Sequence, residues 1–145
     1  MKLNIFKCSE ATEAEITLKY SEETPQIENL IDTLRIFCRS IQAEKDGSSH
    51  TITLDEVFYI ESVDEKCYIY TKTDVYDCKH KLYTLEEMLE DTSFIRISKS
   101  CILNIAKLKS VRPFINGKFE ATMQNDEKII INRHYVSAFK KKFGV

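Results

Sequence analysis

The side chains that could carry out covalent or metal chemistry in this chain are five cysteines and three histidines. The cysteines are widely scattered without a C-x-x-C pair, and the histidines form no H-E-x-x-H motif, so neither pattern indicates a zinc site. Cys78 and His80 would share one face of a strand, but this spacing alone does not make a nucleophile pair. We therefore predict no enzyme, no catalytic residues and no metal site.

Glycine content excludes the common phosphate-binding loops. The three glycines cannot form G-x-x-x-x-G-K-[ST] or G-x-G-x-x-G, so we predict no nucleotide cofactor and no small-molecule substrate. No apolar run approaches the ~20 residues of a membrane span, and the first ten residues lack the apolar core of a signal peptide. We expect a cytoplasmic protein with reduced thiols.

Charge is unevenly distributed along the 145 residues. Residues 96–145 hold eleven lysines and arginines against three acids, whereas residues 1–95 hold ten basic and twenty acidic side chains. A basic segment in an otherwise acidic chain is typical of a protein with one face for a polyanion, although solvated surfaces also carry charge runs. Charge alone leaves both interpretations open.

The beginning of the chain predicts two strands and a helix. Apolar and polar residues alternate over Lys2–Lys7 and Ala14–Tyr20, which indicates strands. Thr24 and Pro25 are typical of a helix start, and apolar residues at helical spacing continue to Phe37. These elements would form a small strand–strand–helix unit.

Beyond the polar break at 45–49 the pattern is dominated by β-strands. Short apolar runs are separated by charged turns without helices between them, which predicts antiparallel pairing. Thr84 to Glu87 has the form of a capping box and predicts a short helix. Asn116-Gly117 predicts a hairpin turn because both positions tolerate positive φ. Strands are expected at 51–54, 57–63, 67–71, 75–79, 94–97, 101–105, 107–112 and 128–131, the hairpin turn lies between 112–115 and 118–122, and a last helix is expected at 134–143.

Two motifs in this second region match a known family. The segment F-x-R-x-x-K-S-x-I-x-N begins at Phe94, and an N-R-x-Y step begins at Asn132, some thirty residues after the first segment ends. From about Ser49 to its end, the sequence resembles the LytTR family of bacterial DNA-binding domains. The resemblance implies a mainly β fold with short helices (α+β), elongated, with about ten strands in three antiparallel sheets.

The resemblance also implies a function. LytTR domains bind double-stranded DNA at promoter repeats and read successive major grooves with loops, so the chain is expected to be a sequence-specific transcriptional regulator, acting as a homodimer on DNA. The expected elements agree, because they offer no pair of adjacent helices for a helix-turn-helix.

The family's DNA contacts fall in three places, each with a match here. The expected contact residues are Lys66 and Cys67 in the hairpin loop after the strand that ends near Ser62, Arg96, Ser98, Lys99 and Ser100 in the F-x-R-x-x-K-S loop, and Asn132, Arg133, His134 and Tyr135 at the N-R-x-Y step. Arginine and lysine can contact guanine, asparagine can pair with adenine, and serines can bind phosphate. The first loop departs from the family pattern, since Asp64 and Glu65 precede Lys66.

The domain organisation predicted from the sequence is a docking or dimerisation unit over residues 1–45 and a DNA-binding domain over residues 46–145. About 45 residues are too few for a doubly wound receiver domain, so we expect no receiver. The arrangement resembles stand-alone LytTR regulators, which are commonly controlled by a partner membrane protein.

Two other functions fit the same residues. Basic loops and strand aromatics also suit an RNA-binding β module. The acidic first loop suits a protein-interaction domain of LytTR-like fold with weak or no DNA binding.

Overall fold

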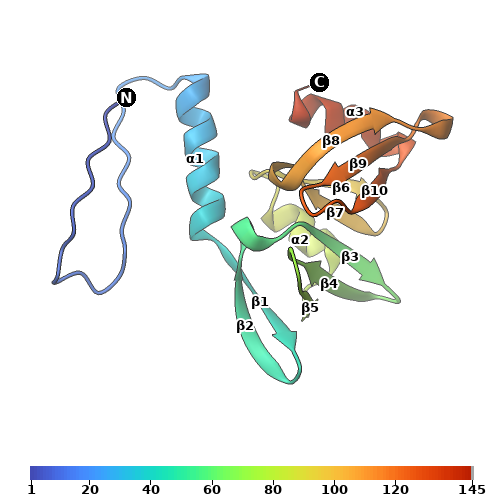
Figure 1. The fold of residues 1–145 in the computed structure, drawn as a ribbon, viewed down its shortest axis with the longest axis horizontal. Coiled ribbons are helices and arrows are strands. Elements are labelled where there is room, and N and C mark those ends of the chain that lie inside the picture. Colours follow the sequence, from blue (N-terminus) through green and yellow to red (C-terminus); the bar gives the residue numbers. More distant parts are fainter. Residues whose placement is uncertain (145) are drawn as a thin grey trace.

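The structure is a computed structural model that describes residues 1–144, apart from the side chain of Arg35. Its strands are β1 (Ser40–Lys45), β2 (Ser48–Thr53), β3 (Tyr59–Val63), β4 (Lys66–Tyr70), β5 (Val75–Cys78), β6 (Phe94–Ser98), β7 (Cys101–Asn104), β8 (Leu108–Pro113), β9 (Phe119–Met123) and β10 (Lys128–Ile131). Its helices are α1 (Pro25–Cys38), α2 (Leu82–Met88) and α3 (Arg133–Phe143), with short 3-10 turns at Leu54–Glu56, Ile105–Lys107 and Ile115–Gly117. Figure 1 shows their arrangement.

The mainly β fold is confirmed, but the expected number of sheets is wrong. Seven strands form one antiparallel sheet in the order β2-β1-β5-β4-β3-β7-β6, and three form a second in the order β10-β9-β8. Two sheets are found among the described residues instead of three because β7 pairs with β3, with Tyr59 opposite Leu103. This pairing joins the β6–β7 hairpin to the strands that precede it in the chain.

The apolar side chains form two clusters, one on each side of the fold. The first lies between the seven-stranded sheet and α2 and includes Leu85 and Ile69, both fully buried. The second lies between the two sheets and α3, where Phe139 is fully buried with Met123. At 25 cal/mol per Å² of apolar area, burying such side chains contributes roughly 1.5–3 kcal/mol each before the cost of ordering the chain.

Asn104 is a buried polar residue at the end of β7 that is hydrogen-bonded to three other segments of the chain. Its amide nitrogen donates to the Val57 carbonyl oxygen at 2.8 Å, and its side-chain oxygen accepts from the Ser93 hydroxyl at 2.6 Å and the Ala106 N–H at 3.1 Å. Asn104, which ends the F-x-R-x-x-K-S-x-I-x-N segment, is therefore a structural residue.

The first 24 residues differ from the prediction. They contain no strand, so the strands expected at 2–7 and 14–20 are wrong for the single chain. Alternation shows which side chains share a face but does not supply a neighbouring strand, and these segments have no ladder in the described residues. The predicted helix is confirmed as α1, where the Thr24 hydroxyl accepts from the Ile27 N–H at 3.3 Å.

The polar break at 45–49 is the turn of the β1–β2 hairpin. Asp46 and Gly47 have φ values of 52° and 76°, the left-handed region that suits such a turn. All six residues of β1 pair with β2, and Glu44 also pairs with Asp77 of β5. The seven-stranded sheet thus includes residues 40–45, which the predicted organisation assigned to the first unit.

Helix ends are set by packing as well as by local signals. α2 begins at Leu82 and not at the predicted capping box, because Leu82 and Leu85 are buried in the first core cluster and fix the helix there. A capping box does form at Thr53 and Glu56. α3 ends at Phe143, and Gly144 follows as its C-cap with a left-handed φ of 87°. Within residues 1–144, none of the helices has the length and apolar character needed to cross a membrane.

Candidate nucleic-acid interface

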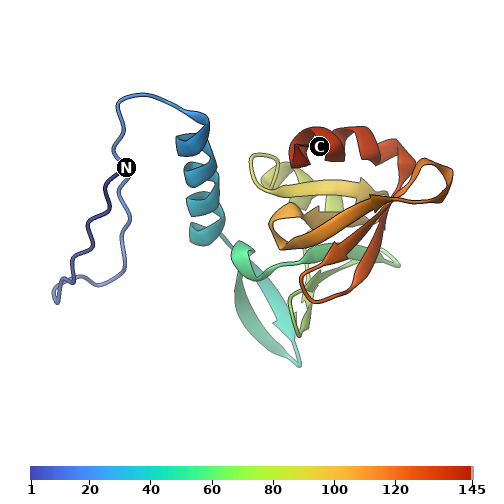
Figure 2. The same cartoon turned by 45° about the horizontal axis from the view of Figure 1, so that its top comes forward.

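The three segments expected to contact DNA meet at one edge of the fold. The Ser62 N–H at the end of β3 donates to the Ser100 carbonyl oxygen at 2.8 Å, and the Asn132 N–H donates to the Ile97 carbonyl oxygen at 2.9 Å. These two bonds connect the β3–β4 turn, the β6–β7 turn and the start of α3. Figures 1 and 2 place them, with the β8–β9 turn, on the side of the molecule opposite α1. We call this set the basic edge: residues 64–66, 98–100, 116–118 and 132–134.

The start of α3 presents two exposed side chains from a fixed backbone. Asn132 is the N-cap, with its side-chain oxygen accepting from the His134 N–H at 3.3 Å. Arg133 and His134 follow in the first turn and are exposed. Because the N–H groups of a first helical turn favour anions, this position suits a phosphate oxygen as well as a base. Tyr135 instead packs half-buried against the second core cluster.

The β8–β9 turn lies against the start of α3, a contact that sequence analysis missed. Asn116 and Gly117 both have positive φ, 57° and 75°, as the Asn-Gly signal predicts. A Cβ atom on Gly117 would be 3.6 Å from the Cβ of Arg133. A surface hollow of about 470 Å³ is lined by Asn116, Lys118, Asn132, Arg133 and His134. Asn116 and Lys118 therefore lie beside the expected contact residues of α3, a proximity that only the three-dimensional fold reveals.

The β6–β7 turn is held in shape by Arg96. Its Nε donates to the Ser98 carbonyl oxygen at 2.7 Å, and another of its nitrogens donates to the Lys99 carbonyl oxygen. A third contact reaches Glu86 Oε2 of α2 at 3.0 Å. The guanidinium is thus bonded to the turn and to α2, which indicates that Arg96 positions the turn; its expected contact with DNA stays a prediction.

The tip of the β6–β7 turn is exposed to solvent and can contact a ligand. Lys99 and Ser100 are exposed, and the Ser100 N–H donates to the Ser98 hydroxyl oxygen at 3.2 Å. The turn therefore offers one ammonium group and two hydroxyl groups on a backbone fixed by Arg96. These groups suit the contacts that position a protein on the phosphate backbone.

The β3–β4 turn corrects one predicted contact. Cys67 is only 4% exposed in the first core cluster, opposite Cys78 in the β4–β5 ladder, so its side chain does not face the edge. Burial raises the pKa of its thiol. Lys66 is exposed beside it, and Asp64 and Glu65 form the turn with φ values of 51° and 66°. The turn thus presents one cation beside two acids.

Many cations outside the basic edge are already paired. Arg112 and Lys109 form ion pairs at 2.8 Å with Glu120 and Asp126, respectively, and Lys142 donates to the Phe94 carbonyl oxygen at 2.7 Å. By contrast, no ion pair within residues 1–144 involves Lys66, Lys99, Lys118 or Arg133. The turns therefore bring four cations without an ion pair to one edge, which raises the local attraction for a polyanion.

The Cys78 and His80 arrangement does not favour nucleophilic chemistry. Cys78 is buried, and burial raises the pKa of its thiol, which lowers the fraction of reactive thiolate at neutral pH. His80 is exposed in the bend after β5. Cys101 is also buried, and burial raises the pKa of its thiol to about 12, so this thiol is less reactive still.

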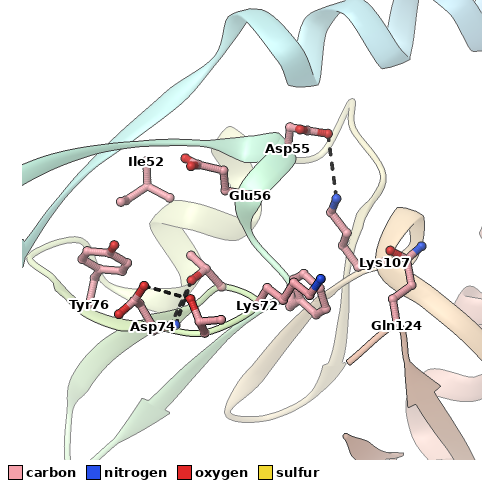
Figure 3. A pocket seen from close by; sticks show the side chains of 11 residues that line it. Ile52, Asp55, Glu56, Lys72, Asp74, Tyr76, Lys107 and Gln124 are labelled. Carbon is pink, nitrogen blue, oxygen red and sulfur yellow. Dashed lines mark hydrogen bonds and ion pairs between the residues drawn. The ribbon is translucent and has the colours of Figure 1, made fainter. Parts of the chain in front are cut away.

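A second hollow, of about 570 Å³, lies at the opposite end of β4 and differs in character (Figure 3). It mixes acids and bases, and its cations are partly engaged: Lys107 Nζ is 3.9 Å from Asp55 Oδ1 and 5.7 Å from the centre of the Phe58 ring. Asp74 in its wall is paired with Lys45, which lowers the pKa of the Asp74 carboxyl. Mixed charge makes this hollow a poor match for a polyanion.

Comparison with known proteins identifies the family. Residues 47–144 match the family described as the LytTr DNA-binding domain, and the chain belongs to this family. The fold is similar to a solved LytTr DNA-binding domain from Bacillus cereus, with a TM-score of 0.69 and 26% identity, covering 73% of this chain and 97% of that one. The family assignment and the mainly β fold expected from the sequence are thus confirmed.

Curated relatives are regulators of greater length. The chain is 33% identical over 91 residues to the sensory transduction protein LytT of Enterococcus faecalis, covering 62% of this chain and 38% of the relative. It is 27% identical over 109 residues to the transcriptional regulatory protein LytR of Staphylococcus aureus, covering 75% of this chain and 44% of the relative. The chain therefore spans less than half the length of these relatives.

Proposed function

We propose that this protein is a sequence-specific, double-stranded DNA-binding transcriptional regulator whose basic edge enters the major groove. The observation that supports this most is the convergence of unpaired cations from four separate segments, Lys66, Lys99, Lys118 and Arg133, on a backbone fixed by hydrogen bonds. Membership of a DNA-binding domain family agrees with it. Turns and one helix start, instead of a recognition helix, supply the contacts.

The residues of the basic edge have different roles in this proposal. Arg133 reads a base, because a guanidinium can make two hydrogen bonds to guanine O6 and N7. Lys99, Lys118 and Lys66 neutralise phosphates, and Ser98, Ser100 and His134 hold phosphate oxygens by hydrogen bonds. Asn132 and Arg96 act mainly by positioning Arg133 and Lys99, respectively. Homodimers on repeated half-sites would place two such edges on successive turns of one duplex.

The test is selection of bound sequences from a random duplex pool with the purified chain, followed by affinity measurements. Selection should enrich a short motif, and Arg133→Ala should cost roughly 1–3 kcal/mol on that motif but much less on random DNA. Equal losses on both DNAs would show that Arg133 only holds phosphate. A pool without enrichment, together with no shift of duplex DNA at low salt, would refute the proposal.

One observation favours a second candidate. Asp64 and Glu65 place two carboxylates at the tip of the β3–β4 turn, where a phosphate backbone would be repelled. A protein-interaction domain with weak or no DNA binding would accommodate them. This candidate predicts that the chain does not bind duplex DNA at low salt. It also predicts that replacing both acids with lysine does not produce DNA binding.

A further inference from the structure

The first 24 residues carry apolar side chains that the described chain leaves uncovered. Leu3, Ile5 and Phe6 are more than 80% exposed, and Ile16 is 62% exposed. Figures 1 and 2 show residues 1–24 as two long arms beside α1, on the side away from both sheets. A monomeric protein rarely exposes a group of large apolar side chains on this scale, so the arms have the character of an interaction surface.

α1 carries a matching apolar stripe. At 100° per residue, Ile27, Leu30 and Leu34 lie on the face of the helix opposite Ile36, which is 7% exposed and packs into the first core cluster. Phe37 extends the stripe and is 60% exposed. Ile36 thus attaches α1 to the domain, whereas the stripe is half-buried at Ile27, Leu30 and Leu34 and keeps apolar surface that a partner would cover.

The arms have strand-like sequences but too few strands to form a sheet alone. Residues 2–7 and 14–20 alternate apolar and polar side chains. An isolated two-stranded hairpin is at best marginally stable in water, whereas three or more strands with an apolar face packed on a helix are stable. A second copy of the chain would double the number of strands and provide a second α1.

Residues 14–20 are also complementary to themselves. When two copies pair antiparallel about Thr17, Glu15 of each lies opposite Lys19 of the other on the polar face. On the apolar face Ile16 lies opposite Leu18. Opposite charges and apolar pairs directly across antiparallel strands are both stabilising. Within the single chain, Glu15 only accepts a long hydrogen bond of 3.5 Å from the Thr17 hydroxyl.

We propose that residues 1–38 form a two-fold symmetric dimer interface whose partner is a second copy of this chain. Residues 14–20 of the two copies pair antiparallel about Thr17, and the apolar face of the resulting sheet packs on the apolar stripes of the two α1 helices. The interface is isologous, because the same residues of both copies form it. It does not depend on DNA binding, since the basic edge lies on the opposite side of the molecule.

Reciprocal charge reversal tests the proposal with the full chain. Glu15→Lys and Lys19→Glu each place like charges opposite one another twice per dimer, so each should raise the dimer dissociation constant about tenfold or more. The double variant Glu15→Lys/Lys19→Glu should recover the affinity of the native dimer. An equimolar mixture of the two single variants should form a heterodimer, because both cross-strand pairs are again of opposite charge. Sedimentation velocity over a range of concentrations measures all four.

Glu10→Lys is the matched control, since it makes the same change of charge outside residues 14–20 and should leave dimerisation unchanged. Leu18→Asp should abolish the dimer while circular dichroism shows an unchanged fold, because residues 1–24 contribute little to either core cluster. A native chain that is monomeric at all concentrations would overturn the proposal and point to a different partner for the arms. A dimer equally affected by Glu10→Lys, or not recovered in the double variant, would overturn it as well.

Discussion

Arg96 provides a sharp test of the difference between a residue that touches DNA and one that shapes the contact surface. Replacing it with methionine keeps the apolar stem and removes the three hydrogen bonds to Ser98, Lys99 and Glu86. The ion pair with Glu86 contributes roughly 0–1 kcal/mol, since Glu86 is 45% exposed. The two bonds to carbonyl oxygens are charge-assisted but border solvent, so Arg96→Met should lower the free energy of unfolding by about 2 kcal/mol.

The effect on DNA should have a distinct signature. Loss of the fixed β6–β7 turn leaves Lys99 to be ordered on binding, so affinity should fall about threefold to tenfold. The slope of log K against log salt should stay the same, because Arg96 releases no counterion in the native complex. A direct phosphate contact would instead reduce the slope by about 0.9.

Affinity titrations at four or more salt concentrations, with urea unfolding of the same samples, measure both quantities. Lys109→Met is the matched control, since it removes one charge and one exposed ion pair, with Asp126, far from the basic edge. Its stability and affinity should remain within about 0.5 kcal/mol of the native values. A flattened salt slope for Arg96→Met with unchanged stability would refute the positioning role.

The remaining predictions concern the turn against α3 and the thiols. Gly117→Ala places a side chain at φ 75° and should lower the free energy of unfolding by about 1 kcal/mol, as urea unfolding would show; no loss would mean that this turn is not left-handed in solution. Cys8 and Cys38 are exposed, whereas Cys67, Cys78 and Cys101 are buried, so a thiol reagent should label two cysteines rapidly in the native chain and all five in denaturant. Rapid native labelling of more than two would contradict the burial of Cys67 and Cys78 in the first core cluster or of Cys101 in the second.

Local signals in the sequence predicted most elements beyond residue 50. The hairpin at 116–117 is marked by an Asn-Gly pair that accepts positive φ, and the hairpin at 64–65 by a charged turn between two apolar runs. Sequence patterns whose structure depends on a neighbouring strand or on burial in the core were less informative. The strands expected at 2–7 and 14–20 do not form in the single chain, and the start of α2 follows the burial of Leu82 instead of the motif at Thr84.

The candidate site was predictable in residue type but not in detail. The two motifs identified the exposed Lys99 and Arg133, because each of these residues lies within a short run of motif residues. Three features depend on the fold: Arg96 turns back onto carbonyl oxygens of its own hairpin, Cys67 points into the core, and Lys118 reaches the start of α3. The alternation of a strand fixes such orientations only once its register is known.

The most direct test of the account compares the loss of charge at the two ends of the seven-stranded sheet. Lys99→Ala, Lys118→Ala and Arg133→Ala remove cations of the basic edge, and Lys72→Ala removes an exposed cation from the β4–β5 turn at the far end. With a selected duplex at fixed salt, each of the first three should weaken binding several-fold or more, and Lys72→Ala should leave it unchanged. Equal losses from all four would show that DNA is attracted by overall charge, and the assignment of the basic edge would be wrong.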